Sequence, residues 1–393
     1  MKDTGTNTCV FFDEQAFLMQ RAGGISRYIT SIATELSKTG EIDVCIFGGL
    51  HRNVHLRETT AHSSLTIHGL LRKDPWRINS LCTSVSRIWR RSLFRKLRRQ
   101  YRTLIFHPSY YEVDPILASQ ADATVVTFHD MIPEWLATKR PSEKASRLPM
   151  IKKDAVNLAS LILANSEATK EDIFSSYPVL EKPVLVTHLA SHLSEDQGIR
   201  HPLPAIVSDS YFLMVGNRGG YKRGDSTIRA FAHLSKSNPG INLVAFGGEE
   251  TLPDEEALLR GHGLMDRWHH VRGDDALLAS CYKHATALVY PSEFEGFGLP
   301  VLEAMSMGCP VITSAKKSIP EVGGESVLYV DPDNIPEISE TMQLLLKVPD
   351  KRTDLITLGF ERSKKFTWQK TAVQTLESYY AACRDSSTGN PGS

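Results

Sequence analysis

The sequence predicts an α/β protein made of two doubly wound domains, each built on its own parallel sheet. Its 393 residues are about 2.6 times the length of a typical domain. Short aliphatic and β-branched runs alternate with longer amphipathic patterns along most of the chain, as in repeated strand–helix units. The short runs are continuously apolar, which is expected of strands buried on both faces of a parallel sheet.

The first half contains six candidate strands. Helical periodicity lies between them, most clearly over Ile25–Lys38 and Ser142–Ser160. The strands are Thr8–Phe12, Asp43–Phe47, Thr103–His107, Thr124–Phe128, Leu161–Ala164 and Pro183–Thr187.

The second half repeats the pattern with five candidate strands. Helices are predicted over Asp225–Ser235, Ala276–Tyr282 and Pro336–Leu346. The strands are Tyr211–Val215, Asn242–Phe246, Thr286–Tyr290, Pro310–Thr313 and Val327–Val330.

A polar stretch between Ala190 and Ser210 has two prolines and no period, which is typical of a linker. We therefore predict a domain over 1–190, a linker over 191–210 and a second domain over 211–367. A helix over 368–384 and a Ser/Gly/Pro-rich tail over 385–393 complete the chain. Two doubly wound domains are expected to face a cleft, with ligands at the carboxyl ends of the strands.

Composition excludes several classes of protein. The chain is 41% hydrophobic and 23% charged, unlike a disordered chain. No apolar run is long enough for a membrane span, and the first residues do not resemble a signal peptide. The six cysteines have no short C-x-x-C spacing, which argues against a zinc ribbon or disulfide scaffold and favours the cytoplasm.

Charge is unevenly distributed although the net charge is zero. Residues 1–200 carry 26 Lys/Arg and 21 Asp/Glu, whereas residues 201–393 carry 19 and 24. Eleven of the 26 Lys/Arg residues in the first half lie from Arg72 to Arg102. Within 81–103 an apolar residue recurs every fourth position, from Val85 to Tyr101, with arginines between. This basic amphipathic helix either lies on an anionic membrane surface or packs its apolar stripe into the core. No aromatic platform or recognition motif favours nucleic acid.

The most informative motif is the segment YPSEFEGFGLPVLE, from Tyr290 to Glu303. A strand, a Gly-rich loop and a helix beginning near Pro300 are predicted, so that backbone N–H groups and a helix N-terminus face an anion or sugar hydroxyls. Glu303 lies among apolar residues and needs a hydrogen-bonding partner, which a ribose diol would supply. An ordinary turn with one exposed and one salt-bridged glutamate remains the alternative.

The spacing Glu295-x7-Glu303 within EGFGLPVLEAMSMGCPVITS resembles the signature of retaining GT-B glycosyltransferases of family 4. Four further segments resemble the family in the same order: FFDEQAFLMQRAGGISRY, VVTFHDMIPEW, ILANSEATKEDI and YFLMVGNRGGYKRGDSTIRAF. The resemblance implies two Rossmann-like domains and transfer of a hexose from a nucleoside-diphosphate sugar to a glycan hydroxyl. It also implies a front-face mechanism without a metal or other cofactor.

The resemblance assigns roles to individual residues. Arg218 and Lys222 would clamp the diphosphate, with Arg223 a third cation of unassigned role, and Glu295 would contact the donor sugar. Glu303 would bind the ribose, and His129 would contact the transferred sugar. The remaining donor-binding positions are Gly24 at the donor phosphate, Gly273 near the base, and Gly296, Phe297 and Gly298 in the signature loop.

Each assignment has a structural alternative. The cations of the Arg218–Lys222 loop also fit a solvated charge pair, Gly23–Gly24 any tight turn, and His129 a structural histidine. Asp130 is not assigned as a catalytic base. Asp331-Pro332-Asp333 has the spacing of a metal-binding pair but is interpreted as a turn. Neither G-x-G-x-x-G after the first strand nor a P-loop is present, which disfavours a dehydrogenase or P-loop NTPase.

The leading hypothesis is a mannosyltransferase that uses GDP-mannose in surface polysaccharide or O-antigen assembly. Its acceptor would be a glycan or lipid-linked glycan, and the protein would be cytoplasmic or peripheral on the inner membrane face. A UDP- or dTDP-sugar donor is the first alternative. A non-catalytic scaffold that binds a sugar nucleotide is the second.

Overall fold

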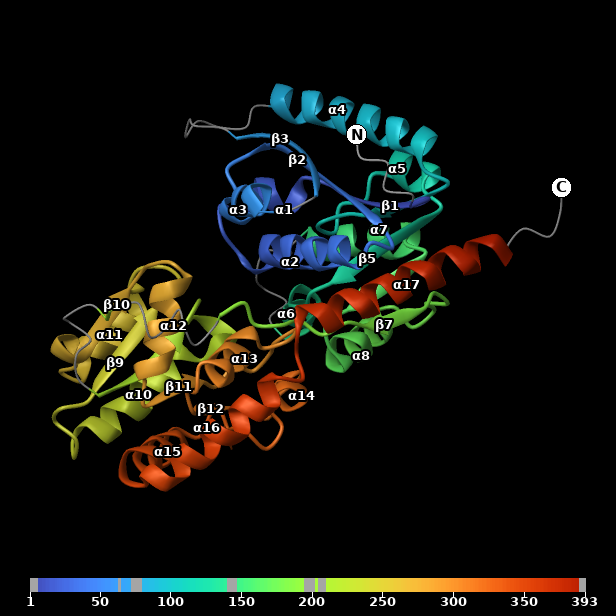
Figure 1. Ribbon diagram of the computed structural model, residues 1–393. Helices are drawn as coiled ribbons and strands as arrows, with labels where there is room; N and C mark the ends of the chain where they lie inside the picture. The colour runs from blue at the N-terminus through green and yellow to red at the C-terminus, as the bar shows by residue number, and fades with distance from the viewer. Residues whose placement is uncertain are drawn as a thin grey trace. The chain divides into compact units, whose positions relative to one another are not determined.

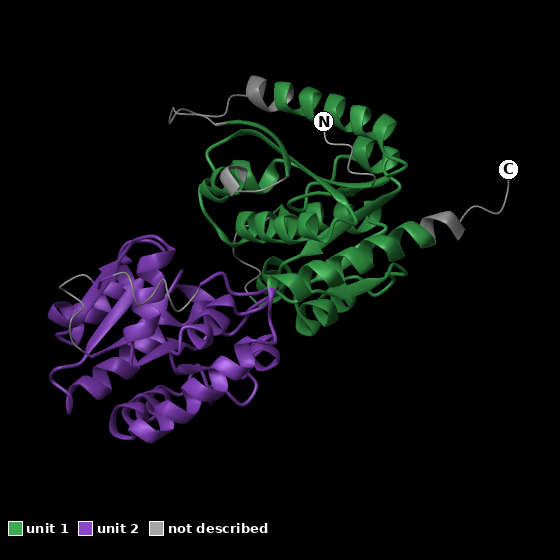
Figure 2. Ribbon diagram, viewed as in Figure 1, with its two compact units in different colours: residues 1–189, 368–393 green, residues 190–367 purple. Residues whose placement is uncertain are grey.

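The computed structural model describes residues 6–62, 65–71, 80–139, 147–193, 202–203 and 210–388. The chain divides into two compact units, one comprising Met1–Leu189 and Trp368–Ser393 and the other Ala190–Thr367. Figure 2 colours the two units, and Figure 1 labels their helices and strands. Most of the predicted linker lies outside the described residues.

The first unit is built on a seven-stranded sheet in the order β3-β2-β1-β4-β5-β6-β7. Neighbouring strands pair in parallel throughout. The chain starts at β1, builds outward through β2 and β3, and then returns to the other side of β1 with β4. The strands are β1 Thr8–Phe12, β2 Asp43–His51, β3 Thr66–Leu71, β4 Thr103–His107, β5 Ala123–Phe128, β6 Leu161–Ala164 and β7 Val184–Val186.

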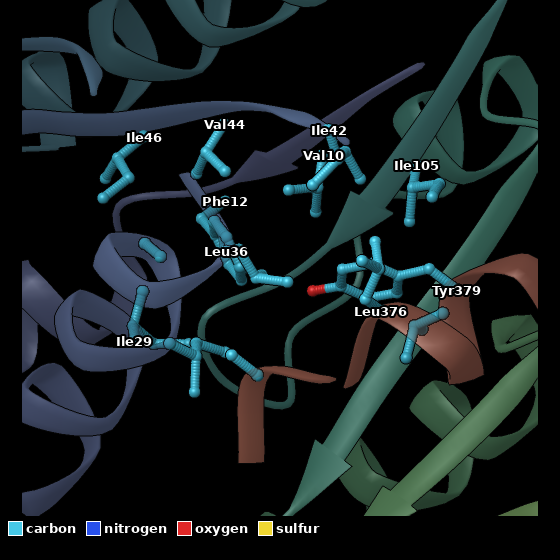
Figure 3. Close-up of a cluster of buried hydrophobic side chains, with 14 of the residues drawn as sticks. Val10, Phe12, Ile29, Leu36, Ile42, Val44, Ile46, Ile105, Leu376 and Tyr379 are labelled. Atoms are coloured by element: carbon cyan, nitrogen blue, oxygen red, sulfur yellow. The ribbon is translucent and has the colours of Figure 1, made fainter. Parts of the chain in front are cut away.

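Helices cover both faces of this sheet. Val10 and Phe12 of β1 pack against α2 and α17, as Figure 3 shows for the surrounding cluster. Phe11 points to the opposite face, because side chains alternate along a strand, and its ring meets Phe94 of α4 at 5.2 Å between centroids. The helices are α1 Gln15–Met19, α2 Gly24–Thr39, α3 Val54–His62, α4 Ser80–Gln100, α5 Pro115–Gln120, α6 Ile132–Lys139, α7 Leu148–Leu158, α8 Glu167–Ser176 and α17 Trp368–Thr388.

The second unit has a six-stranded parallel sheet in the order β10-β9-β8-β11-β12-β13. The strands are β8 Tyr211–Val215, β9 Asn242–Phe246, β10 Trp268–Val271, β11 Ala287–Tyr290, β12 Val311–Ser314 and β13 Leu328–Val330. Its core joins the sheet to α10 and α15. The helices are α10 Gly224–Ser235, α11 Pro253–Gly261, α12 Asp275–His284, α13 Leu299–Ser306, α14 Ile319–Gly323, α15 Ile335–Lys347 and α16 Pro349–Ser363.

The α/β prediction is confirmed, but two strands were missed. Both β3 and β10 lie at the edge of their sheets. Edge strands are partly solvated and need not be continuously apolar, and these two contain the polar residues His68, His269 and His270. A search for continuous apolar runs therefore passes over them.

Helix boundaries differ in two places. The helix predicted over Ser142–Ser160 is described only over Leu148–Leu158, and 142–146 lie outside the described residues. The C-terminal helix continues to Thr388, past the predicted start of the tail at residue 385. The sequence contains no glycine or proline between Trp368 and Gly389, so nothing in it stops the helix earlier.

Most of the apolar stripe of the basic helix α4 packs into the protein, although Val85 at its start is exposed. Leu93 and Leu97 are buried, and the Trp89 ring meets Phe47 of β2 edge-on at 4.9 Å. Packing into the core is thus the correct alternative for the stripe from Trp89 to Leu97, since the sheet needs a cover on that face. Among the described residues, no helix is both long and apolar enough to cross a membrane.

Candidate functional site

In the second sheet the order in which strands are added reverses between β8 and β11. From β8 the chain builds toward β9 and β10, and it then returns to β11 on the other side. Loops that leave the carboxyl ends of two such strands splay apart and leave room for a ligand. Here they are residues 216–223 after β8 and residues 291–298 after β11, which contain most of the predicted donor-site residues.

Lys222 and Glu295 meet across this switch point. The Lys222 Nζ lies 2.6 Å from Glu295 Oε1 and donates to the Tyr290 hydroxyl at 2.7 Å. Both charged side chains are largely buried. An ammonium group has three N–H donors, so these two contacts leave one N–H of Lys222 for a ligand.

The backbone of the signature loop is held by hydrogen bonds to residues outside the loop. Ser318 Oγ donates to the Glu295 carbonyl at 2.9 Å, and the Glu293 amide donates to the Tyr221 carbonyl at 2.8 Å. Gly298 has a φ of 93° at the start of α13, and a Cβ there would lie 2.7 Å from Ile319 Cδ1. Only glycine fits that position without strain. With Gly298 fixed, the neighbouring Gly296 and Phe297 are buried at the helix N-terminus.

Glu303 projects from α13 into a second polar cluster. Its side chain accepts from the Tyr282 hydroxyl at 3.1 Å, and its Oε1 lies 3.9 Å from Nδ1 of His192. Glu303 and Glu295 are 5% and 7% exposed. The alternative of one exposed glutamate in an ordinary turn is therefore wrong.

Arg218 is buried and fully engaged within the protein. Its Nε and Nη2 donate to the two oxygens of Glu255 at 2.8 and 3.0 Å. Its Nη1 donates to the Gly247 carbonyl at 3.1 Å, with Gly216 O at 3.4 Å, and Nη2 also donates to the Glu249 carbonyl at 2.9 Å. All five guanidinium donors are used, and they tie the loops after β8 and β9 to α11. The predicted contact of Arg218 with a diphosphate would require it to leave these partners.

The remaining cation of this loop also has protein partners. Arg223 Nε lies 3.1 Å from Glu293, and its Nη2 pairs with Asp333. The Asp333 amide in turn donates to Asp331 Oδ1 at 3.0 Å, as in an Asx turn. Among the described residues, no group of three or more His, Cys, Asp or Glu side chains is arranged to hold a metal ion.

Gly273 lies in the short loop between β10 and α12. The Asp274 side chain accepts from the Leu277 amide at 3.0 Å and caps α12. A Cβ on Gly273 would come within 2.5 Å of the Leu277 side chain. This cap fixes the loop whose backbone is predicted to meet the base.

In the first unit, His129 follows β5 in a turn whose backbone is held by three side chains. The His129 amide donates to the Tyr111 hydroxyl at 3.0 Å, and its carbonyl accepts from Asn165 Nδ2 at 2.6 Å. The next carbonyl, of Asp130, accepts from Nζ of the fully buried Lys152 at 2.7 Å. Burial lowers the pKa of His129 to about 4, so its imidazole is neutral at pH 7.

Gly24 is the first residue of α2. A Cβ on Gly24 would meet no atom within 4 Å, so the backbone is open to a ligand at this helix N-terminus. The structure places a short helix, α1, between β1 and the Gly23–Gly24 turn, which the sequence analysis did not anticipate.

Sequence reasoning missed an acidic pair at the switch point of the first sheet. Asp13 directly follows β1, and its Oδ1 accepts from the amide and hydroxyl of Ser109, after β4, at 2.9 and 2.7 Å. Glu14 pairs with Arg90 of α4 at 3.0 Å. Burial raises the pKa of Glu14 despite this ion pair. Two acids directly after a buried strand were the signal available in the sequence.

Comparison with known proteins places both halves in glycosyltransferase families. Residues 22–190 match the model described as Glycosyltransferase Family 4, and residues 197–362 match glycosyl transferases group 1. An O-antigen chain mannosyltransferase B of Escherichia coli is 27% identical over 91% of this chain and 95% of its own length. An MMP alpha-(1->4)-mannosyltransferase of Mycolicibacterium hassiacum is 34% identical over 56% of this chain and 54% of its own.

Comparison with solved structures also finds a protein of similar fold. A sucrose-phosphate synthase from Thermosynechococcus elongatus superposes with a TM-score of 0.70 at 19% identity, covering 96% of this chain and all of its own. At that identity the likeness concerns the fold alone. The two matching halves and the two Rossmann-like sheets together show that this chain belongs to the GT-B glycosyltransferases, with a family 4 domain followed by a group 1 domain.

Proposed function

We propose that the protein transfers mannose from GDP-mannose to a glycan hydroxyl, with retention of the anomeric configuration, during surface polysaccharide assembly. Both relatives described above are named as mannosyltransferases, and one of them acts on an O-antigen chain. The observation that carries the proposal is the Lys222–Glu295 pair at the β8–β11 switch point, with Glu303 on the helix that follows.

Lys222 supplies the positive charge for the leaving group. Cleavage of the bond from sugar to phosphate builds negative charge on the diphosphate, which fixed cations and N–H dipoles stabilise best in a water-poor site. The third N–H of Lys222 and the positive end of the α13 dipole are suited to this task.

Glu295 contacts the transferred sugar in this proposal. The Glu295 carboxylate is oriented by Lys222. It accepts a hydrogen bond from a sugar hydroxyl or faces the positive charge that develops on the sugar. In the first unit, the neutral imidazole of His129 has one donor and one acceptor available for a sugar hydroxyl. In a front-face displacement the departing phosphate accepts the acceptor's proton, so no protein base is assigned.

Arg218 is assigned a positioning role instead of a diphosphate contact. Its engagement with Glu255 and with the carbonyls of Gly247 and Glu249 holds the loop that ends in Lys222. Gly248 supports this arrangement, because a Cβ there would lie 2.4 Å from the Gly216 carbonyl oxygen.

A thermal-shift panel tests the donor site. GDP, UDP, dTDP and ADP are added with and without EDTA to the wild type, to Glu303→Gln and to a control, Glu340→Gln, at an exposed position of α15. A ligand bound only by the folded state raises Tm. We expect a shift with GDP that EDTA leaves unchanged, that Glu303→Gln loses and that Glu340→Gln keeps.

Other thermal-shift results would change the proposal. A shift with UDP or dTDP alone would reassign the donor, and loss of the shift in EDTA would overturn metal independence. No shift with any nucleotide would overturn the donor site itself. Binding without transfer to any mannoside acceptor would favour the scaffold. NMR of the product anomer tests retention.

We also propose that the exposed face of α4 contacts an anionic membrane, where a lipid-linked acceptor would lie. Its exposed side chains include Arg87, Arg95, Lys96 and Arg99, with Val85 and Ile88 at 55% and 68% exposure. Basic side chains near an anionic surface contribute about 1 kcal/mol each. Replacing the four basic residues with glutamate should abolish flotation with phosphatidylglycerol vesicles. Unchanged flotation would contradict the proposal.

A further inference from the structure

His192 lies on the segment that enters the second unit, which the sequence analysis treated as linker. Ala190 and Leu193 on either side are buried. Ser306 of α13 donates a hydrogen bond to the Ser191 hydroxyl at 3.1 Å. The segment is therefore fastened to the helix that carries Glu303, and His192 is held in place beside that glutamate.

The imidazole of His192 sits between two carboxylates. Its Nε2 lies 3.4 Å from Asp275 Oδ1, and its Nδ1 lies 3.9 Å from Glu303 Oε1. Both ring nitrogens are inaccessible to solvent and have no hydrogen-bond partner among the described residues. Buried polar atoms are nearly always satisfied. Asp275 lies close enough to serve Nε2, whereas Nδ1 is left for a partner other than the described residues.

The neighbours of His192 identify that partner by its chemistry. Glu303 is the proposed ribose ligand, and Asp275 begins α12 directly after the loop containing Gly273, which is expected to meet the base. His192 thus lies between the two segments assigned to the nucleoside. If Nε2–H points toward Asp275, Nδ1 is an acceptor, and it lies 3.9 Å from the acceptor Oε1 of Glu303. Two acceptors at this spacing suit the two hydroxyl donors of a vicinal diol.

We infer that His192 is a second ribose ligand, accepting a hydrogen bond from one ribose hydroxyl while Glu303 accepts from the other. Asp275 is a positioning residue that fixes the tautomer of the imidazole. This inference rests on the proposed function, because it requires a nucleoside diphosphate at Glu303. It makes the segment before the second domain part of the nucleotide site.

Deoxynucleotides test the assignment by calorimetry. GDP, 2′-deoxy-GDP and 3′-deoxy-GDP are titrated into the wild type, His192→Ala, His192→Phe, Glu303→Gln and a control, His233→Ala, at an exposed position of α10. The phenylalanine variant keeps a ring of similar size without nitrogens and covers the case in which alanine disturbs folding. One hydrogen bond is worth about three- to tenfold in affinity.

We expect both His192 variants to bind GDP about three- to tenfold more weakly and to lose discrimination against one of the two deoxynucleotides. The wild type and His233→Ala should discriminate against both. Undiminished GDP affinity and discrimination in His192→Phe, with weakened binding in Glu303→Gln, would overturn the role of His192 alone. Full GDP affinity in Glu303→Gln would overturn the ribose site and the proposed donor site with it.

Discussion

Replacing Arg218 with methionine separates a positioning role from direct contact with the diphosphate. The side chain is 2% exposed and its partner Glu255 is 7% exposed. Methionine retains much of the apolar volume but removes all five donors, leaving the Glu255 carboxylate buried without its cation. Among the described residues, Glu255 then keeps one hydrogen bond, from the Leu252 amide at 3.0 Å.

The expected loss of stability follows from that unpaired charge. Breaking a buried ion pair by removing one partner costs about 3–5 kcal/mol. In a unit of this size each kcal/mol lowers Tm by roughly 2–4 °C, so Tm of the second unit should fall by about 10 °C. The Arg218→Met/Glu255→Met double variant removes both charges and should recover much of this loss.

Urea unfolding of the wild type, both single variants and the double variant measures the coupling directly. A strongly coupled pair supports the positioning role. The opposite result would be a loss below about 1 kcal/mol in Arg218→Met, together with abolished nucleotide binding. That outcome would refute this reasoning and restore Arg218 as a diphosphate ligand.

Three other perturbations have defined outcomes. Lys222→Gln should lower kcat by about 10²–10³-fold, the effect of losing one group that stabilises a leaving oxyanion, and normal turnover would exclude its proposed role. Gly298→Ala should cost about 1–3 kcal/mol in urea, because alanine is strained at a φ of 93° and would meet Ile319, whereas the control Gly261→Ala meets no atom. Burial lowers the pKa of His107 to about 3, below its ordinary 6.5. The unfolded chain therefore binds more protons between these values, and stability should fall as pH drops from about 6.5 toward 3. This slope should be flatter in His107→Gln, as measured by urea midpoints at several pH values.

Local patterns were enough for most of the fold because buried parallel strands have a strong signature. Strands such as β1 and β8 are continuously apolar and were predicted at their observed positions, Thr8–Phe12 and Tyr211–Val215. The edge strands β3 and β10 were not, since a strand with one solvated side tolerates polar residues. In α4 the sequence showed an apolar stripe and a basic face, but only the packing of Trp89 and Leu93 showed where the stripe goes.

The sequence by itself determined the α/β class, the Gly-rich loops that follow two of the strands and the residues of the Glu295–Glu303 signature. These depend on local periodicity and on spacing within one strand–loop–helix unit. Only the tertiary structure decided which charges meet. It paired Lys222 with Glu295, turned Arg218 inward to Glu255 and brought His192 beside Glu303. These partners lie 37 to 111 residues apart in the chain. Contacts at such separations depend on how helices and loops pack around the sheet, which no local pattern of residues encodes.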